Sequence, residues 1–254
     1  MRLSVFTTSK LLAENHITGI FSERQGGISP APFDSLNLGL DLGDSDENVQ
    51  HNLKQLCLGA QLPIPHRSEQ VHGTNYLLCA GEGIQHNHQA DILITRTAGC
   101  AVAVRTADCL PILLIDTQAG VAAAVHAGWR GTVQNIAQVA IQKMQAFGAK
   151  AEHILACLGP CIAEPCFEID IDTGKQLSHS HPQAHLYIRY KNDKAWANIQ
   201  AINTLQLQSS GLKSTNIESL SLCTSCLPER FFSYRRNGIQ AGRQLAIVAL
   251  PDAL

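Results

Sequence analysis

The sequence predicts an α/β fold, an α+β sandwich in which a mixed β-sheet is flanked by helices, within a single domain covering residues 1–254. Three observations lead to this prediction. Several short runs rich in Val, Ile, Leu and Ala have the composition of strands, and some are apolar at nearly every position, as strands covered on both faces are. Other stretches have apolar residues at helical spacing. No Pro-, Ser- or Gly-rich linker divides the chain.

The first third is predicted to contain a long loop followed by a helix. Gly26-Gly27 and the prolines after them are typical of a surface loop. We expect Asp44 to be the N-cap of the helix, with Glu47 completing a capping box and Gly59 ending it. The apolar face of this helix consists of Val49, Leu53, Leu56 and Cys57.

The middle and last thirds supply the predicted strands and two further helices. We expect strands over residues 90–95, 100–106, 109–116, 120–126, 153–159 and 243–250. We expect helices over residues 133–148 and 193–211. This order favours strands packed between helices.

The composition argues against several functional classes. The formal net charge of −2 gives no electrostatic basis for binding nucleic acid or an anionic membrane, and 5% aromatic residues is little for a base-stacking surface. The N-terminus has no continuous apolar segment typical of a signal peptide. The most apolar stretch is interrupted by Asp116, Gln118 and His126, so no membrane span is expected. Nine cysteines, an odd number, favour free thiols in a reducing compartment, and we expect a cytoplasmic protein.

Three residues form the candidate catalytic site. Cys109 begins one predicted strand and His126 ends the next, so they would meet at one sheet edge if the two strands pair antiparallel. His72, in "SEQVHG", is the third candidate. One thiolate and two imidazoles suit Zn²⁺, with Cu²⁺ as an alternative, and three protein ligands leave a fourth position for water. On the residues alone, a cysteine or a histidine in such apolar strands is more often an inert or structural residue than a metal ligand, so Cys109 and His126 could both be core residues.

Other histidine and cysteine motifs are predicted to be structural. "HNH" at 86–88 and "HSH" at 179–181 resemble the His-x-His pairs of copper oxidases, but no Cys flanked by His accompanies them, and we expect surface loops. "CTSC" at 223–226 lacks a second ligand pair, and Pro228 follows it too closely for a redox helix. "PCIAEPC" at 160–166 has too long a spacing for a zinc deaminase.

Polar residues in loops are the candidates for binding substrate. The arginine guanidinium suits a phosphate or carboxylate group if several converge, although many loop arginines are simply solvated. Cys161 is included because it follows "LGP". The candidate substrate-binding residues are Arg24, Asn37, Gln70, Asp108, Arg130, Cys161 and Arg235.

Long motifs throughout the chain resemble those of the YfiH family, also called the laccase-domain or multicopper polyphenol oxidase family. They are "SERQGGIS…FDSLNLGLDLGDSDENV", "SEQVHG", "ADILITRTAGCAVAVRTADCLPILLID", "HAGWRGT", "LGPCIAEPCFEI" and "CTSCLPERFFSYRRNGIQAGRQLAIV". The resemblance covers nearly the whole chain, and several of these motifs are long and specific.

The resemblance implies a metal site and an activity. Family members bind one metal, usually zinc, through residues that correspond here to His72, Cys109 and His126. Their fold is similar to that of cysteine-hydrolase-like toxin domains. The implied activity is phosphorolysis of adenosine, inosine and methylthioadenosine, together with deamination of adenosine, by a monomer or weak homo-oligomer. Arg24, Arg130 or Arg235 would position phosphate.

Three other hypotheses stay open at this point. The first is a copper-dependent polyphenol oxidase, as the older family name suggests. The second is a cysteine hydrolase that edits peptidoglycan precursors, in which Cys109 is a nucleophile activated by His126. The third is a binding module without catalytic activity.

Overall fold

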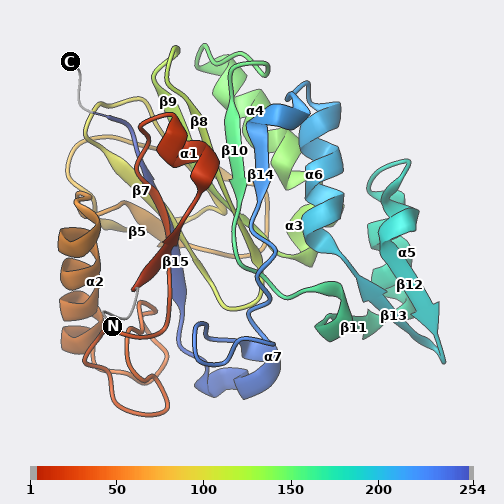
Figure 1. Cartoon of the computed structure of the whole chain (residues 1–254), viewed down its shortest axis with the longest axis horizontal. Helices are drawn as coiled ribbons and strands as arrows, with labels where there is room; N and C mark the ends of the chain where they lie inside the picture. The colour runs from red at the N-terminus through yellow and green to blue at the C-terminus, as the bar shows by residue number, and fades with distance from the viewer. Residues whose placement is uncertain (1–4, 252–254) are drawn as a thin grey trace.

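The computed structural model describes residues 5–251 and shows four layers, in the order helix, sheet, sheet, helix (Figure 1). One large sheet has the strand order β1-β2-β15-β7 and the other the order β14-β10-β8-β9-β6-β4. Their strands are β1 (Phe6–Thr8), β2 (Gly19–Ser22), β15 (Gln244–Ala249), β7 (Ala101–Thr106), β14 (Ile217–Ser219), β10 (Leu155–Leu158), β8 (Leu110–Asp116), β9 (Val121–Ala127), β6 (Ile92–Thr95) and β4 (Tyr76–Cys79). The helices are α1 (Lys10–Glu14), α2 (Asp46–Ala60), α3 (Trp129–Val133), α4 (Ile136–Ala146), α5 (Ile171–His179), α6 (Ile199–Ser209) and α7 (Tyr234–Asn237).

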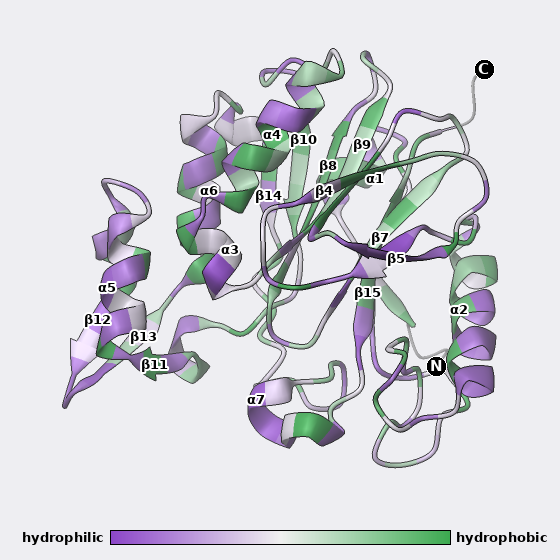
Figure 2. Ribbon diagram, turned by 180° about the vertical axis from the view of Figure 1, so that it is seen from behind, coloured by the Kyte–Doolittle hydropathy of each residue, from purple (hydrophilic) through white to green (hydrophobic). Residues whose placement is uncertain are grey.

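Three apolar layers hold these elements together. α4 and α6 cover the outer face of the six-stranded sheet, where Leu114 of β8 packs in one cluster with Met144 of α4. The two sheets face each other through a second cluster that includes Leu113 of β8 and Val104 of β7. α2 covers the outer face of the four-stranded sheet. Because β8 lies between two apolar layers, all of its residues are buried, and Figure 2 colours most of the strand as hydrophobic.

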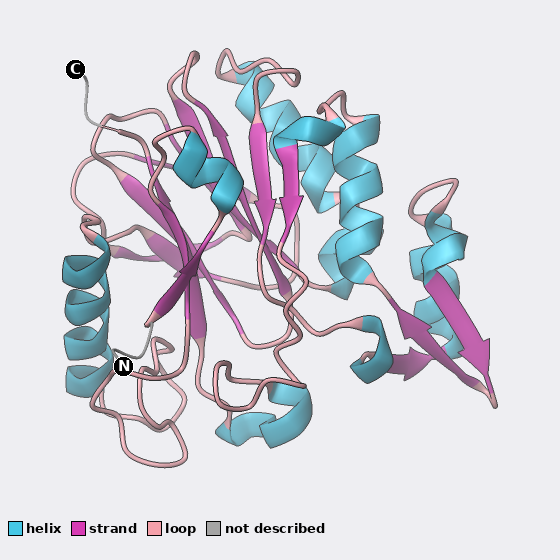
Figure 3. Cartoon of the chain, in the orientation of Figure 1, coloured by secondary structure: helices cyan, strands magenta, loops and turns pink. Residues whose placement is uncertain are grey.

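A smaller layer projects from one side of this sandwich (Figure 3). It consists of the sheet β11-β13-β12 and helix α5, with its own apolar cluster around Leu177 and Ala195. Its strands are β11 (Glu168–Asp170), β12 (Ile188–Lys191) and β13 (Lys194–Ala197), and a separate pair consists of β3 (Arg67–Glu69) and β5 (Gln85–Gln89). Among residues 5–251, no helix is long and apolar enough to cross a membrane.

The predicted α/β class is confirmed, and each of the six predicted strands is present, as β6, β7, β8, β9, β10 and β15. β8 and β9 pair antiparallel, as expected, with Pro111 opposite His126. The sequence predicts one mixed sheet flanked by helices, whereas the structure has two large sheets that pack face to face, each covered by helices on its outer side.

The predicted boundaries of the first helix are wrong. Ser45, not Asp44, is the N-cap of α2, and its hydroxyl accepts a hydrogen bond from the Asn48 N–H at 3.2 Å. The Asp44 carboxylate instead accepts from Ser29 and other loop groups. The helix passes Gly59 and ends where Gln61 adopts a left-handed conformation, with φ of 55°.

Three other expectations need correction. The predicted helix over 193–211 begins only at Ile199, because 194–197 form β13, whose alanines are buried against α5. The predicted helix over 133–148 is interrupted at Asn135, where φ is 56°. "HNH" is not a loop but part of β5, and the His86 Nε2 lies 2.9 Å from the Nδ1 of His66.

Candidate metal centre and substrate cavity

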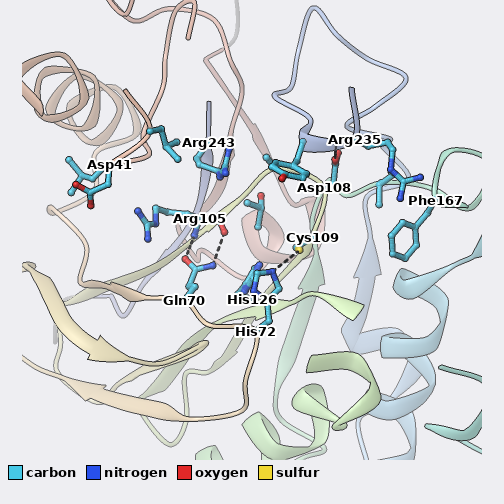
Figure 4. Close-up of a pocket in the computed structure, with 16 residues that line it drawn as sticks. Asp41, Gln70, His72, Arg105, Asp108, Cys109, His126, Phe167, Arg235 and Arg243 are labelled. Carbon is cyan, nitrogen blue, oxygen red and sulfur yellow. Dashed lines mark hydrogen bonds between the residues drawn. The ribbon is translucent and has the colours of Figure 1, made fainter. Parts of the chain in front are cut away.

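The β8–β9 hairpin places Cys109 and His126 side by side. Cys109 directly precedes β8, and His126 lies near the end of β9. His72 reaches them from the loop between β3 and β4, so that one ligand atom of each residue lies within 4.8 Å of the others. The Cys109 Sγ is 3.8 Å from the His72 Nε2, and the two imidazole centroids are 4.8 Å apart (Figure 4). The structure therefore brings the three predicted ligands together.

A buried carboxylate that the sequence analysis missed orients both histidines. Asp91 precedes β6, which pairs with β9. Its Oδ1 accepts from the His126 Nδ1 at 2.7 Å and from the backbone N–H of His72 at 3.0 Å. Its Oδ2 accepts from the N–H groups of Val71 at 3.1 Å and Gly73 at 2.8 Å. Three consecutive N–H groups thus surround one carboxylate, and His72 adopts a left-handed conformation with φ of 61° within this turn.

His72, Cys109 and His126 are called the trio below, and their charges suit a metal ion. Burial alone would raise the pKa of the Cys109 thiol, but the imidazoles of His126 and His72 outweigh it and lower that pKa to about 6. Burial opposes the charged form of His126, yet the Cys109 thiolate and Asp91 raise its pKa to about 9. Since the His126 Nδ1 donates to Asp91, its Nε2 is the nitrogen left for a metal.

The backbone leaves room beside the ligands. Gly128 is the N-cap of α3, and a Cβ at this position would lie 2.8 Å from the His72 Cδ2 and 3.1 Å from the Cys109 Sγ. Any larger residue would therefore displace two ligands. With a thiolate and two imidazoles converging, the residues fit Zn²⁺ in a site with an open position.

A cavity of about 470 Å³ opens above the trio, a size typical of sites for small molecules. Of the other sequence candidates, Gln70, Asp108 and Arg235 line it (Figure 4). The remaining side chains on its walls are not among the residues that the sequence predicts for the site. These include Leu40, Asp41, Leu42, Arg105, Ile162, Phe167, Tyr234 and Arg243.

Two half-buried guanidinium groups give the cavity a positive wall. Among the residues that the structure describes, neither Arg105 nor Arg243 forms an ion pair, and the Arg105 guanidinium makes no hydrogen bond. The Arg243 guanidinium donates to the backbone carbonyls of Ala241 and Gly242. Burial lowers the pKa of both arginines, but a guanidinium keeps its proton at neutral pH. The wall can therefore attract an anion.

The polar candidates in the cavity are held by hydrogen bonds. Gln70 pairs with the backbone of Arg105 through two hydrogen bonds of 2.8 Å. Asp108, with φ of 94°, accepts from the Thr224 hydroxyl at 2.6 Å, the Ser233 hydroxyl at 3.0 Å and a backbone N–H at 2.6 Å. The guanidinium of Arg235 donates to the carbonyls of residues 166 and 168. These hydrogen bonds fix the shape of the wall and occupy donors and acceptors that would otherwise be available to a ligand.

Two candidates from the N-terminal loop lie outside the cavity lining. The Arg24 guanidinium binds the Asp34 carboxylate at 3.1 Å and stacks on the ring of Phe232. Asn37 is fully buried and donates to the carboxylate of Asp44 at 2.9 Å. Both side chains stabilise the loop that precedes α2, because their polar groups are used within it or against the C-terminal segment.

Two further candidates, Arg130 and Cys161, also lie outside the cavity lining. Arg130 is exposed on α3, with its guanidinium 4.3 Å from the ring centroid of Trp129. Cys161 is buried below the cavity wall, where its backbone pairs with that of Cys223. Neither side chain reaches the space above the metal ligands.

A family model described as multi-copper polyphenol oxidoreductase laccase matches residues 18–251. The purine nucleoside phosphorylase YfiH of Shigella flexneri is 37% identical over 85% of this chain and 87% of its own length. A protein from an unknown prokaryotic organism, named adenosine deaminase RL5, is 35% identical over 82% of this chain and 77% of its own. A solved Neisseria meningitidis protein has a TM-score of 0.85 at 30% identity, covering 98% of this chain and 100% of that one.

Proposed function

Because this chain belongs to the YfiH family, we propose that it is a zinc-dependent purine nucleoside phosphorylase that also deaminates adenosine. The matching family model is the one described as multi-copper polyphenol oxidoreductase laccase. Its substrates would be adenosine, inosine and methylthioadenosine with phosphate, and its products the free base and the sugar 1-phosphate. One observation carries the proposal. A cysteine and two imidazoles converge at the base of a cavity whose wall presents Arg105 and Arg243, which form no ion pair with any residue between 5 and 251.

His72, Cys109 and His126 would hold the zinc ion. When bound, the ion supplies a Lewis acid that polarises an oxygen and lowers the pKa of water. Asp91 fixes the tautomer and orientation of His126 and the backbone turn at His72, so the donor atoms stay in place before the metal arrives.

Arg105 and Arg243 would bind the phosphate co-substrate. Phosphorolysis requires phosphate beside the C1′ atom of the ribose, and a planar guanidinium can bind a phosphate through two hydrogen bonds. Phe167 and Tyr234, on the same cavity, offer aromatic faces to a purine base. Asp108 positions the segment that carries Tyr234, since it accepts hydrogen bonds from that segment.

The test is incubation of adenosine with purified protein, with and without phosphate, followed by product analysis. Adenine and ribose 1-phosphate that form only with phosphate support phosphorolysis, and phosphate-independent inosine supports deamination. If neither adenine nor inosine forms at any zinc loading, the proposal is wrong. Oxygen uptake by the copper-loaded protein with a polyphenol would instead support the oxidase hypothesis.

A second candidate function is favoured by the arrangement of the groups around Cys109, which lies close to His126, while His126 is hydrogen-bonded to Asp91. Cys109, His126 and Asp91 are arranged as a nucleophile, a base and the carboxylate that orients the base, which is the arrangement of a cysteine hydrolase. Alkylation distinguishes the two functions. Zinc should protect Cys109 from iodoacetamide if the thiolate is a ligand, whereas a hydrolase should be inactivated at the same rate with and without zinc.

A further inference from the structure

Three cysteines outside the trio come together beside the cavity. Cys223 and Cys226 are the first and last residues of the "CTSC" turn, and Cys166 ends the short 3₁₀ segment Glu164–Cys166. Their three sulfur atoms all lie within 4.8 Å of one another, and those of Cys166 and Cys226 are 3.0 Å apart. The third thiol thus comes from 60 residues before Cys226, which sequence spacing could not reveal.

The "CTSC" turn is shaped to hold a thiolate. The Ala163 N–H donates to the Cys223 Sγ at 3.4 Å. Burial raises the pKa of the Cys223 thiol, but the backbone N–H groups of Ala163, Cys226 and Ser225 outweigh burial and lower that pKa. Hydrogen bonds from N–H groups favour the charged form of an acceptor. Two cysteines on one turn with a third from a separate segment supply three sulfur ligands, a donor set of the kind that binds zinc once the metal displaces the thiol protons.

The surroundings allow an ion to enter and offset the charge. Cys226 is exposed, while Cys166 and Cys223 are half-buried, so the open side of the cluster faces solvent. The guanidinium of Arg236 donates to the carbonyls of Thr224 and Ser225, within the turn itself. A nearby fixed positive charge stabilises a site that becomes anionic when three thiolates surround a divalent ion.

We propose that Cys166, Cys223 and Cys226 form a second metal site that takes a thiophilic cation such as Zn²⁺. The ion would tie the 164–166 segment to the "CTSC" turn. Phe167 follows Cys166, and Arg235 donates to the Cys166 carbonyl, and both residues line the cavity. The ion would therefore fix one wall of the cavity, and none of its three ligands lines the substrate space.

Zinc content of the reduced protein tests the proposal without any measurement of activity. Wild type, C166S, C226S and the matched control S225A are loaded with Zn²⁺ in the presence of a phosphine reductant, desalted, and analysed for zinc per chain. C166S and C226S should each lose one equivalent relative to wild type, and S225A should lose none because it keeps all three thiols. Equal zinc content in wild type and C226S overturns the proposal.

Alkylation with mass spectrometry gives a second, independent measurement on wild type. Zinc should slow iodoacetamide labelling of Cys166, Cys223 and Cys226 at least tenfold, and a chelator should restore the rate. Labelling of Cys226 that is the same with and without zinc contradicts the proposal. A second result would also contradict the proposal: the reduced protein takes up no zinc at these sulfurs, and a Cys166–Cys226 disulfide forms in air. The cluster would then be a redox pair. Both readouts stand whether or not the chain phosphorolyses nucleosides.

Discussion

Replacing Asp91 by Asn tests how the metal centre is built. The substitution keeps the size of the side chain but turns one oxygen, which only accepts, into an NH₂ group, which only donates. In one orientation of the Asn amide, its oxygen faces His126 and its NH₂ group faces the N–H groups of Val71 and Gly73. In the wild type these two N–H groups donate to the Asp91 Oδ2 at 3.1 and 2.8 Å. If the group is reversed, the NH₂ faces the His126 Nδ1 and forces the proton onto the nitrogen that should bind the metal.

The expected magnitude follows from these contacts. Loss of an outer-shell partner of a metal ligand costs about 10- to 100-fold in metal affinity, which is about 1.4–2.7 kcal/mol. Each buried N–H that loses its acceptor costs a further 1–3 kcal/mol or so of folding stability. With two such N–H groups, we therefore expect D91N to bind zinc at least tenfold more weakly and to lose about 2–6 kcal/mol in free energy of unfolding.

The assay is a zinc titration against a competing chelator, combined with urea unfolding of the metal-free protein. D116N is the matched control, since Asp116 is a buried carboxylate that also accepts backbone N–H bonds, at the opposite end of β8 from Cys109. It should lose stability but bind zinc as wild type does. If D91N and D116N lose stability equally and both keep full zinc affinity, Asp91 only supports the fold and the reasoning is refuted.

Three further predictions concern the same cavity. In the metal-free protein, the rate of Cys109 alkylation should rise as the pH increases through about 6 and level off above it, because the lowered pKa leaves the thiol ionised above that pH. H126A should shift this midpoint upward. An unchanged midpoint would show that the His126 imidazole does not lower the pKa. G128A should weaken zinc binding at least tenfold, because its methyl group would meet His72 and Cys109; wild-type affinity in G128A would mean that the ligands can move aside. R105M should raise the KM for phosphate about tenfold or more with little change in the KM for adenosine, as expected from the loss of one charge-assisted hydrogen bond, and an unchanged phosphate KM would place the anion elsewhere.

The sequence predicted well what depends on neighbouring residues. β8 and β9 are continuous apolar runs because both of their faces are buried, and their antiparallel pairing was enough to place Cys109 near His126. Asp91 was missed because a single acidic residue before a strand has no periodic signal, and its role arises only from the pairing of β6 with β9. The segment 194–197 was predicted as helix because its alternation is weak, and its pairing with β11 and β12 decides its conformation.

Loop arginines were the weakest part of the prediction for the same reason. Arg24 precedes Gly26-Gly27 in a predicted loop, but its guanidinium binds Asp34 and the C-terminal segment, which is distant in sequence. Arg105 was overlooked within a buried strand, although its side chain lies on the cavity wall. The sequence shows that a charged residue is present, whereas the partner that neutralises it depends on the tertiary fold.

The metal ligands and the cavity walls come from different parts of the molecule. His72, Cys109 and His126 belong to the six-stranded sheet and the loop anchored to it by Asp91, whereas Phe167 and Tyr234 belong to segments at its margin. Substitutions in those marginal segments can reshape the space for a base or sugar without moving a donor atom. Descendants of one ancestral gene can therefore diverge in the molecules they accept while inheriting the same reactive centre, and selection can act on the two properties separately.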